Sequence, residues 1–205
     1  MMNDLQLVDA LEGALPVYEI PDDDLVGEVL IPALAAADSV DIAVGFFTSQ
    51  CLAQIAPGLA GLIDRGVHCR LLVSPEISEE DRNAIDQGLS NPEDVLNEFM
   101  LNLIARADAD PISAHAADCL AYLVAAGTFD IRCVLMERGM FHKKSWTIEA
   151  NGQRVGIHGS GNLTARGLLV NGEQMTIDRP WVDGEASAQR VDRLATSFQQ
   201  HWDNQ

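Results

Sequence analysis

Residues 141–162 read FHKKSWTIEANGQRVGIHGSGN, and this stretch decides the expected fold. Its residues follow a period of two over Phe141 to Glu149 and again over Arg154 to Gly159, as β-strands do. Between the two runs lies Asn151-Gly152, and Asn-Gly is the strongest two-residue hairpin signal. The stretch therefore predicts a β-hairpin.

Polar side chains suited to a phosphodiester flank this hairpin. On a strand, the i, i+2 spacing of His142 and Lys144 puts both side chains on one face. A histidine can act as nucleophile or proton donor, and a lysine supplies positive charge for a phosphate. Ser160 and Asn162, which follow the second strand, can hydrogen-bond the phosphate oxygens. These residue types together predict a shared phosphate site.

The same residues resemble the signature of the phospholipase D superfamily, which is H-x-K, then Asp, then G-S-x-N. His142 and Lys144 match H-x-K, and Gly159-Ser160-Gly161-Asn162 matches G-S-x-N. This chain departs from the pattern in two ways. Glu149 stands at the position of the family Asp, and nine residues rather than six separate it from Gly159. The Asn-Gly turn accounts for the added length, because a longer hairpin leaves its two ends in place.

Other segments extend the resemblance over roughly Asp24 to Trp202. Leu163 to Gly167 and Asn171-x-Glu173 resemble the N-x-T-x-x-G and N-x-E elements of the nuclease-like branch. Asp41 to Ser49 and Asp64 to Ser74 are similar to the first two strands of such domains. The combination resembles the phospholipase-D-like domain associated with Swi/Snf-type helicases. That resemblance implies DNA defence or processing, with such a helicase as a partner.

The resemblance also implies a mechanism without metal or other cofactor. One histidine attacks phosphorus to form a phosphohistidine, and a second protonates the leaving oxygen. We expect Glu173 to hydrogen-bond the ring nitrogen of His142 that does not react, which would fix the orientation of the ring. The expected roles are catalysis for His142, Lys144 and Glu173, phosphate binding for Ser160, Asn162 and Lys143, and structural support from Glu149 and Gly159.

The chain contains one H-x-K element, because neither His68 nor His158 is followed by Lys two positions on. Since the chemistry needs two histidines, the second must come from another subunit. A two-fold axis brings the same patch of both chains together. We therefore expect a homodimer with a composite site.

Charge is distributed unevenly along the chain. The net charge of −18 argues against tight non-specific binding to nucleic acid. Residues 131–166, however, hold six Lys and Arg residues and two Glu residues, and both lysines of the chain, Lys143 and Lys144, are among them. This concentration indicates an anionic ligand at the hairpin. The family resemblance implies that this ligand is a nucleic acid and favours DNA, but the sequence itself does not distinguish DNA from RNA. Tight binding is expected to need a partner domain.

The whole sequence predicts a single α/β domain over residues 1–205, with its core at about 24–202 and a mixed β-sheet flanked by helices on both faces. Val40 to Thr48 and Val67 to Ser74 are apolar runs typical of buried parallel strands. The other expected strands are Ile131–Met136 and Met175–Asp178. The expected helices are 25–34, 52–64, 78–88, 91–103, 111–126 and 185–202.

Cysteine content and hydropathy suggest where the protein resides. The chain has no C-x-x-C pair, so we expect buried thiols in an intracellular, cytoplasmic protein. No apolar run approaches the ~18 residues of a membrane span, and the acidic start lacks the basic region of a signal peptide. The cysteines are Cys51, Cys69, Cys119 and Cys133.

Two classes of function fit the sequence. The first is a metal-independent phosphodiesterase, a nuclease, which the intact H-x-K and G-S-x-N elements favour. The second is a catalytically weak or inactive module that binds nucleic acid or a protein partner, which Glu149 and the acidic composition favour. A metal site built from His142, His158, Glu149 and Glu173 is not expected, since their spacing fits no familiar ligand pattern and the lysines would repel a cation.

Overall fold

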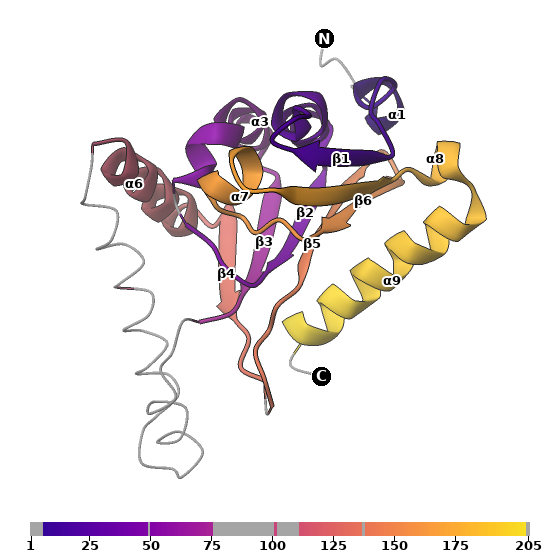
Figure 1. Cartoon of the computed structure of the whole chain (residues 1–205). Helices are drawn as coiled ribbons and strands as arrows, with labels where there is room; N and C mark the ends of the chain where they lie inside the picture. The colour runs from indigo at the N-terminus through magenta and orange to yellow at the C-terminus, as the bar shows by residue number, and fades with distance from the viewer. Residues whose placement is uncertain (1–5, 49, 76–100, 102–110, 137, 204–205) are drawn as a thin grey trace.

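The computed structural model describes residues 6–48, 50–75, 101, 111–136 and 138–203. Within these residues, seven strands form one sheet in the order β1-β7-β6-β5-β2-β3-β4 (Figure 1). β2, β3 and β4 run parallel, and the other neighbouring pairs are antiparallel. The strands are β1 (Val17–Ile20), β2 (Ser39–Val44), β3 (His68–Val73), β4 (Phe129–Cys133), β5 (Lys144–Ala150), β6 (Gln153–Gly159) and β7 (Glu173–Asp178).

Helix α3 (Cys51–Arg65) connects the parallel strands β2 and β3. It ends at the expected place, because Gly66 adopts a left-handed conformation with φ of 65° that favours glycine. α6 (Pro111–Ala125) precedes β4 and packs against both α3 and β4. The parallel half of the sheet is therefore built from strand–helix–strand units, as its apolar strands predict.

The β5–β6 hairpin forms as predicted. Asn151 and Gly152 have φ of 50° and 74°, the positive values that a tight hairpin turn requires at both positions. Glu149 pairs with Arg154 next to the turn, and Ser145 pairs with His158 towards the open end. The hairpin lies in the middle of the sheet, where β5 borders β2 and β6 borders β7.

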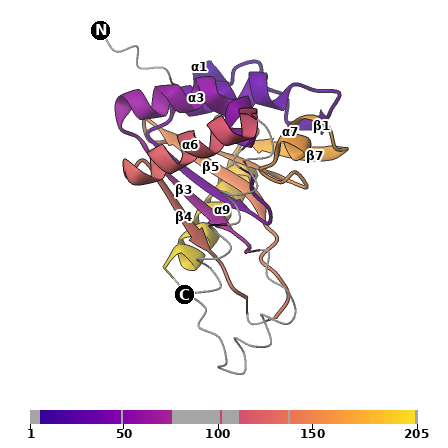
Figure 2. The same cartoon turned by 90° about the vertical axis from the view of Figure 1, so that its left-hand side faces the viewer.

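Helices cover both faces of the sheet (Figures 1 and 2). α1 (Leu7–Ala10), η1 (Val26–Leu30) and α2 (Ile31–Ala36) lie with α3 on one face, and α9 (Glu185–Trp202) crosses the other. Two short helices, α7 (Ala165–Leu169) and α8 (Pro180–Asp183), occupy connections near β7.

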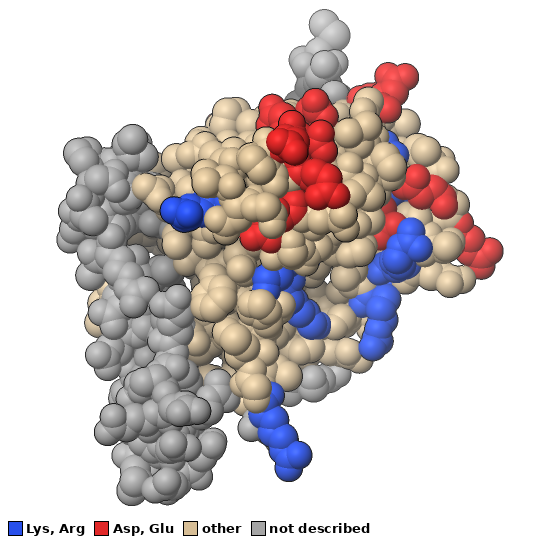
Figure 3. Space-filling model, in the orientation of Figure 1, with Lys and Arg blue, Asp and Glu red and all other residues tan. Residues whose placement is uncertain are grey.

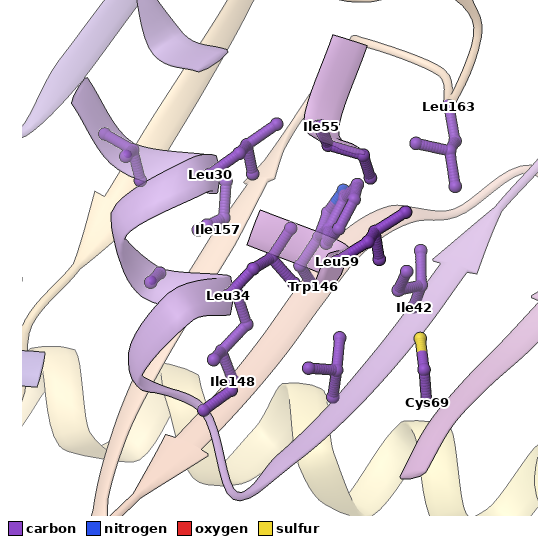
Figure 4. Close-up of a cluster of buried hydrophobic side chains, with 14 of the residues drawn as sticks. Leu30, Leu34, Ile42, Ile55, Leu59, Cys69, Trp146, Ile148, Ile157 and Leu163 are labelled. Atoms are coloured by element: carbon purple, nitrogen blue, oxygen red, sulfur yellow. The ribbon is translucent and has the colours of Figure 1, made fainter. Parts of the chain in front are cut away.

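The main core lies between the sheet and the α2–α3 face, where apolar side chains of helices and strands meet (Figure 4). A smaller cluster lies under α9 on the opposite face. The main core includes Leu30, Leu34, Ile55, Leu59, Trp146, Ile148 and Ile157, and the smaller cluster consists of Ala43, Leu72, Phe141, Phe198 and Trp202.

The predicted mixed sheet with helices on both faces is confirmed, and α9 has the predicted bounds. The strand predicted from Phe141 begins instead at Lys144, because Phe141 packs into the cluster under α9 and leaves the ladder. The edge strand β1 was not predicted. The helices predicted over 78–88 and 91–103 lie outside the described residues, apart from Leu101.

The expectation of four buried thiols is correct for Cys51 and Cys69 and wrong for Cys119, which is exposed on α6. Cys133 is partly buried, and this burial raises the pKa of its thiol to about 11. In the described part of the chain, no helix combines the length and apolar character that crossing a membrane requires.

Candidate active site

The sheet topology gathers the expected site at one end of the sheet. Lys144 begins β5 and pairs with Val44, the last residue of β2. Because β5, β6 and β7 are successively antiparallel, the end of β6 and the start of β7 lie beside the start of β5. The H-x-K element, the G-S-x-N loop and Glu173 therefore meet at this edge, although up to 31 positions separate them in sequence.

His142 lies just before β5, with its ring exposed to solvent. The ring packs edge-on against Phe46, with 5.8 Å between the ring centroids and an interplanar angle of 80°. It also lies over Gly45: a Cβ atom at that position would come within 2.7 Å of His142 Cδ2. A side chain at position 45 would therefore displace the imidazole, and only glycine leaves room for it.

Asn162 approaches the same glycine. Its Oδ1 accepts a hydrogen bond from Phe46 N at 3.0 Å and lies 3.4 Å from the Cβ position of Gly45. Thr48 N donates to the Leu163 carbonyl at 3.1 Å, which ties the two loops together. Since Oδ1 is occupied, the Asn162 amide nitrogen is the group left to donate to an incoming oxygen.

Ser160 and Glu173 form a second part of the site. Ser160 Oγ donates to Glu173 Oε2 at 2.5 Å and accepts a hydrogen bond from Gln174 N at 3.1 Å. This pairing depends on Gly159, because a Cβ there would lie 2.0 Å from the Gln174 carbonyl oxygen. The glycine of G-S-x-N thus allows β6 and β7 to approach closely enough for the serine to reach the glutamate.

Lys144 supplies the positive charge of the site. Its Nζ donates to the His142 carbonyl oxygen at 3.1 Å. Partial burial lowers the pKa of Lys144, while the negative charge of Glu173 acts in the opposite direction. The ammonium group thus lies within electrostatic reach of the Glu173 carboxylate.

Two other predicted residues, Glu173 and Lys143, lie differently from the expectation. Within the described part of the chain, the Glu173 carboxylate bonds to Ser160 and Asn171, and the expected bond to His142 is not formed. Lys143 turns towards α9, where its Nζ donates to Ser197 Oγ. Glu149 lies at the turn end of β5 and accepts a hydrogen bond from Arg154 at 2.6 Å, so it belongs to the hairpin and not to the site.

Sequence reasoning did not identify Gly45 and Phe46 as part of the site. The signal was present, because a glycine at the end of an apolar strand marks a place where another group approaches the backbone closely. The G-S-x-N loop is followed by the short helix α7. Its N-cap is Thr164, whose Oγ1 accepts a hydrogen bond from Gly167 N at 2.9 Å.

A histidine and a lysine before a central strand, with a Ser/Asn loop at the end of the hairpin partner, define a phospholipase-D-like α/β protein. Residues 30–202 match the family described as cardiolipin synthase, PLD-like domain, and the chain belongs to this family. A search of curated protein sequences found no match.

Solved structures show the same fold at low sequence identity. NucT from Helicobacter pylori superposes with a TM-score of 0.58 at 14% identity, covering 91% of this chain and 94% of that one. Nuc from Salmonella typhimurium, a phospholipase D family member, gives 0.54 at 15% identity, with 91% and 92% covered. Phosphatidylserine synthase from Haemophilus influenzae gives 0.55 at 11% identity, where 90% of this chain matches only 38% of the other.

Proposed function

We propose that the protein is a metal-independent phosphodiesterase that cleaves nucleic acid, DNA in preference to RNA, through a phosphohistidine at His142. The observation that carries the proposal is that His142 and Asn162 both reach Gly45, beside the Lys144 ammonium group. A nucleophile, a side-chain amide and a cation thus lie together at one end of the sheet, as attack on a phosphodiester requires.

The reaction then proceeds in two steps. The ring of His142 attacks phosphorus, and an N–P bond forms as the bond to the leaving oxygen breaks. His142 of the partner subunit gives its ring proton to that oxygen. Water next attacks phosphorus, the partner's His142 takes the proton from the water, and the N–P bond breaks. Lys144 and Asn162 stabilise the negative charge on the phosphorane oxygens in both steps.

The homodimer is part of this proposal, because the chain carries one H-x-K element. His142 is exposed, so its ring can face a second copy across a two-fold axis. Light scattering tests this directly: an active monomer at assay concentration would show that one chain suffices.

The distribution of charge supports an anionic substrate at this end of the sheet. On the face seen in Figure 3, acidic side chains gather over the upper part, near the N-terminal helices, whereas Lys and Arg side chains lie mainly below them. The net charge of −18 weakens general attraction to DNA. We therefore include in the proposal a partner that delivers the DNA, such as the Swi/Snf-type helicase implied by the sequence resemblance.

The test is hydrolysis of bis(p-nitrophenyl) phosphate and of an oligodeoxynucleotide in excess EDTA. Wild type should hydrolyse both, and His142→Ala should lose on the order of 10³-fold or more in kcat while unfolding at the same temperature. Acid quench during turnover should trap a phosphoryl group on His142 of the wild type. Activity that disappears with EDTA and returns with Mg²⁺ or Zn²⁺ would refute the metal-independent mechanism.

A second variant tests the observation that carries the proposal. Gly45→Ala should lower kcat by about 10²-fold, because its methyl group would push the His142 ring from its position. Gly13→Ala is the matched control, since nothing lies within 4 Å of a Cβ at that position. Equal activity of the two variants would show that the observed placement of the His142 ring does not matter for turnover.

One observation favours a binding module that does not cut. The Glu173 carboxylate is engaged by Ser160, and within the described residues it leaves His142 without an orienting acid. In that case His142→Ala would weaken oligonucleotide binding, and neither wild type nor variant would show turnover.

A further inference from the structure

A hollow of about 300 Å³ lies beside the candidate active site, between the start of β5 and α9. No carboxylate is among the residues that line it. Its polar lining consists of Lys143, Lys144, Ser145, His158, Arg193 and Ser197. Because Lys144 lines the hollow and also contacts His142, the hollow opens next to the proposed catalytic centre.

Two cations lie close together in this hollow. Lys143 is half-buried, and its Nζ donates a hydrogen bond to Ser197 Oγ. Ser197 lies one helical turn after Arg193 on α9. Burial, and next the positive charge of Arg193, lower the pKa of Lys143. Within the described residues, neither cation has a carboxylate oxygen within 4.0 Å, since neither takes part in an ion pair there.

Acidic residues outnumber basic ones in the chain, 31 to 13, yet no carboxylate in the described part of it forms an ion pair with either of these cations. Some described arginines do have acidic partners, as Arg70 has Asp41 and Arg154 has Glu149, whereas Arg65 and Arg132 donate to backbone carbonyls. Holding two like charges together without a counter-charge is unfavourable in the empty protein. An anion bound between them would remove that cost, because a guanidinium and an ammonium both bind phosphate oxygens strongly.

His158, which lines the hollow, is held by an ionic network around the buried Asp178. His158 Nε2 lies 3.0 Å from Asp178 Oδ2, and the Asp178 carboxylate also accepts hydrogen bonds from Arg190 Nε and Nη2. The Asp178 side chain is only 2% exposed, so its negative charge is directed at these partners and not into the hollow. His158 therefore lines the hollow in a set orientation.

We propose that this hollow, defined by Lys143, Arg193 and Ser197, binds the phosphate next to the scissile one in a nucleic-acid strand. Lys143 and Lys144 are consecutive residues that bind different phosphates. Lys144 binds the scissile phosphate at His142, and Lys143 and Arg193 bind the adjacent phosphate. The inference rests on the proposed function, and it specifies the substrate as a polymer with successive phosphates. A phospholipid with a single phosphodiester would leave the hollow unused.

The test compares Arg193→Gln with Ala186→Glu. Both variants change the net charge by −1 on exposed positions of α9, but Ala186 lies two turns away and outside the hollow. The substrates are a single-stranded oligodeoxynucleotide and bis(p-nitrophenyl) phosphate, which has one phosphate. Arg193→Gln should lower the ratio of kcat/KM for the oligonucleotide to that for the small diester by about tenfold, because one phosphate contact is lost. Ala186→Glu should leave this ratio within about twofold of wild type.

Three kinetic results would overturn the inference. Equal losses on both substrates would place Arg193 in the catalytic step. An unchanged ratio would mean that Arg193 touches no substrate phosphate. If both variants lowered the ratio equally, the effect would come from the change in net charge and not from a contact of Arg193 with the phosphate.

Equilibrium binding of a fluorescent oligonucleotide to the same proteins separates this inference from the proposed function. The slope of log K against log salt should become shallower by about 0.7 in Arg193→Gln alone, the value for one contact to a single strand. If the wild type binds the oligonucleotide with the steeper salt dependence but cleaves nothing, the proposed nuclease activity is wrong and the proposed phosphate-binding site is supported. If Arg193→Gln weakens binding to phosphatidylglycerol vesicles but does not change binding to the oligonucleotide, the assignment of the ligand as nucleic acid is wrong.

Discussion

The two faces of the central sheet are built differently. On the α2–α3 face, several helices pack a continuous apolar layer onto the strands. On the α9 face, a single helix covers a five-residue cluster, which is bordered by ionic groups such as the Arg70–Asp41 pair and the Asp178–Arg190 pair. We infer that the first face supplies most of the stability and that the second gives up some packing so that charged groups can face a ligand.

The largest expected effect compares two adjacent residues of β3. Leu71 faces the main core and Leu72 faces the small cluster under α9, and both are 0% exposed. Leu71→Ala should lower the free energy of unfolding by about 4 kcal/mol, because the layered core cannot close around the cavity. Leu72→Ala should cost about 3 kcal/mol, since α9 alone can shift towards the gap. Urea unfolding measures both, and a larger loss for Leu72 would reverse the comparison.

The better-packed face was also the more predictable one. α3 was recognisable from its apolar periodicity and from Gly66 at its end, both of which are local signals. β1 was missed because it is four residues long and is held by β7, about 155 positions away in sequence. The start of β5 was misplaced because Phe141 packs under α9, and such a tertiary contact leaves no local signal.

The site shows the same limit. His142, Lys144, Ser160 and Asn162 were predicted because their chemistry and spacing are visible in the sequence. The orientation of Lys143 towards Ser197 was not predicted, because it depends on how α9 crosses the sheet. Sequence reasoning therefore named candidate reactive groups, but it did not predict the contacts that position them.

The second prediction concerns the polar network of the α9 face. Burial alone would raise the pKa of the Asp178 carboxyl, but hydrogen bonds from Arg190 and His158 outweigh it and keep the pKa below its usual value. A carboxyl with a lowered pKa in the folded state stabilises the fold above its unfolded value of about 3.9, and this contribution disappears as the pH falls through the folded pKa. Asp178→Asn should therefore lower the free energy of unfolding by about 2 kcal/mol at pH 7, less than a fully buried pair would, because half of Arg190 is exposed.

The pH dependence is the sharper measurement for Asp178. Wild type should lose stability below about pH 4, and Asp178→Asn should lose less over the same range because the titrating group is gone. Asp130→Asn is the control, since Asp130 is half-exposed and, among the residues that the structure describes, forms its ion pair with His68 at the sheet edge. Identical acid profiles for wild type and Asp178→Asn would show that this network does not stabilise the α9 face.

The smallest expected effect belongs to Glu149, at the position of the family Asp. Its side chain and that of Arg154 are 38% and 37% exposed, so water screens their 2.6 Å contact. Glu149→Ala should therefore lower the free energy of unfolding by only about 0.5 kcal/mol. kcat/KM on bis(p-nitrophenyl) phosphate should stay within about twofold, because Glu149 lies at the far end of β5 from Lys144. Glu149→Asp restores the family residue and should match wild type in activity. A large gain with Asp would mean that this position acts on the site through the hairpin, although it lies at the other end of β5.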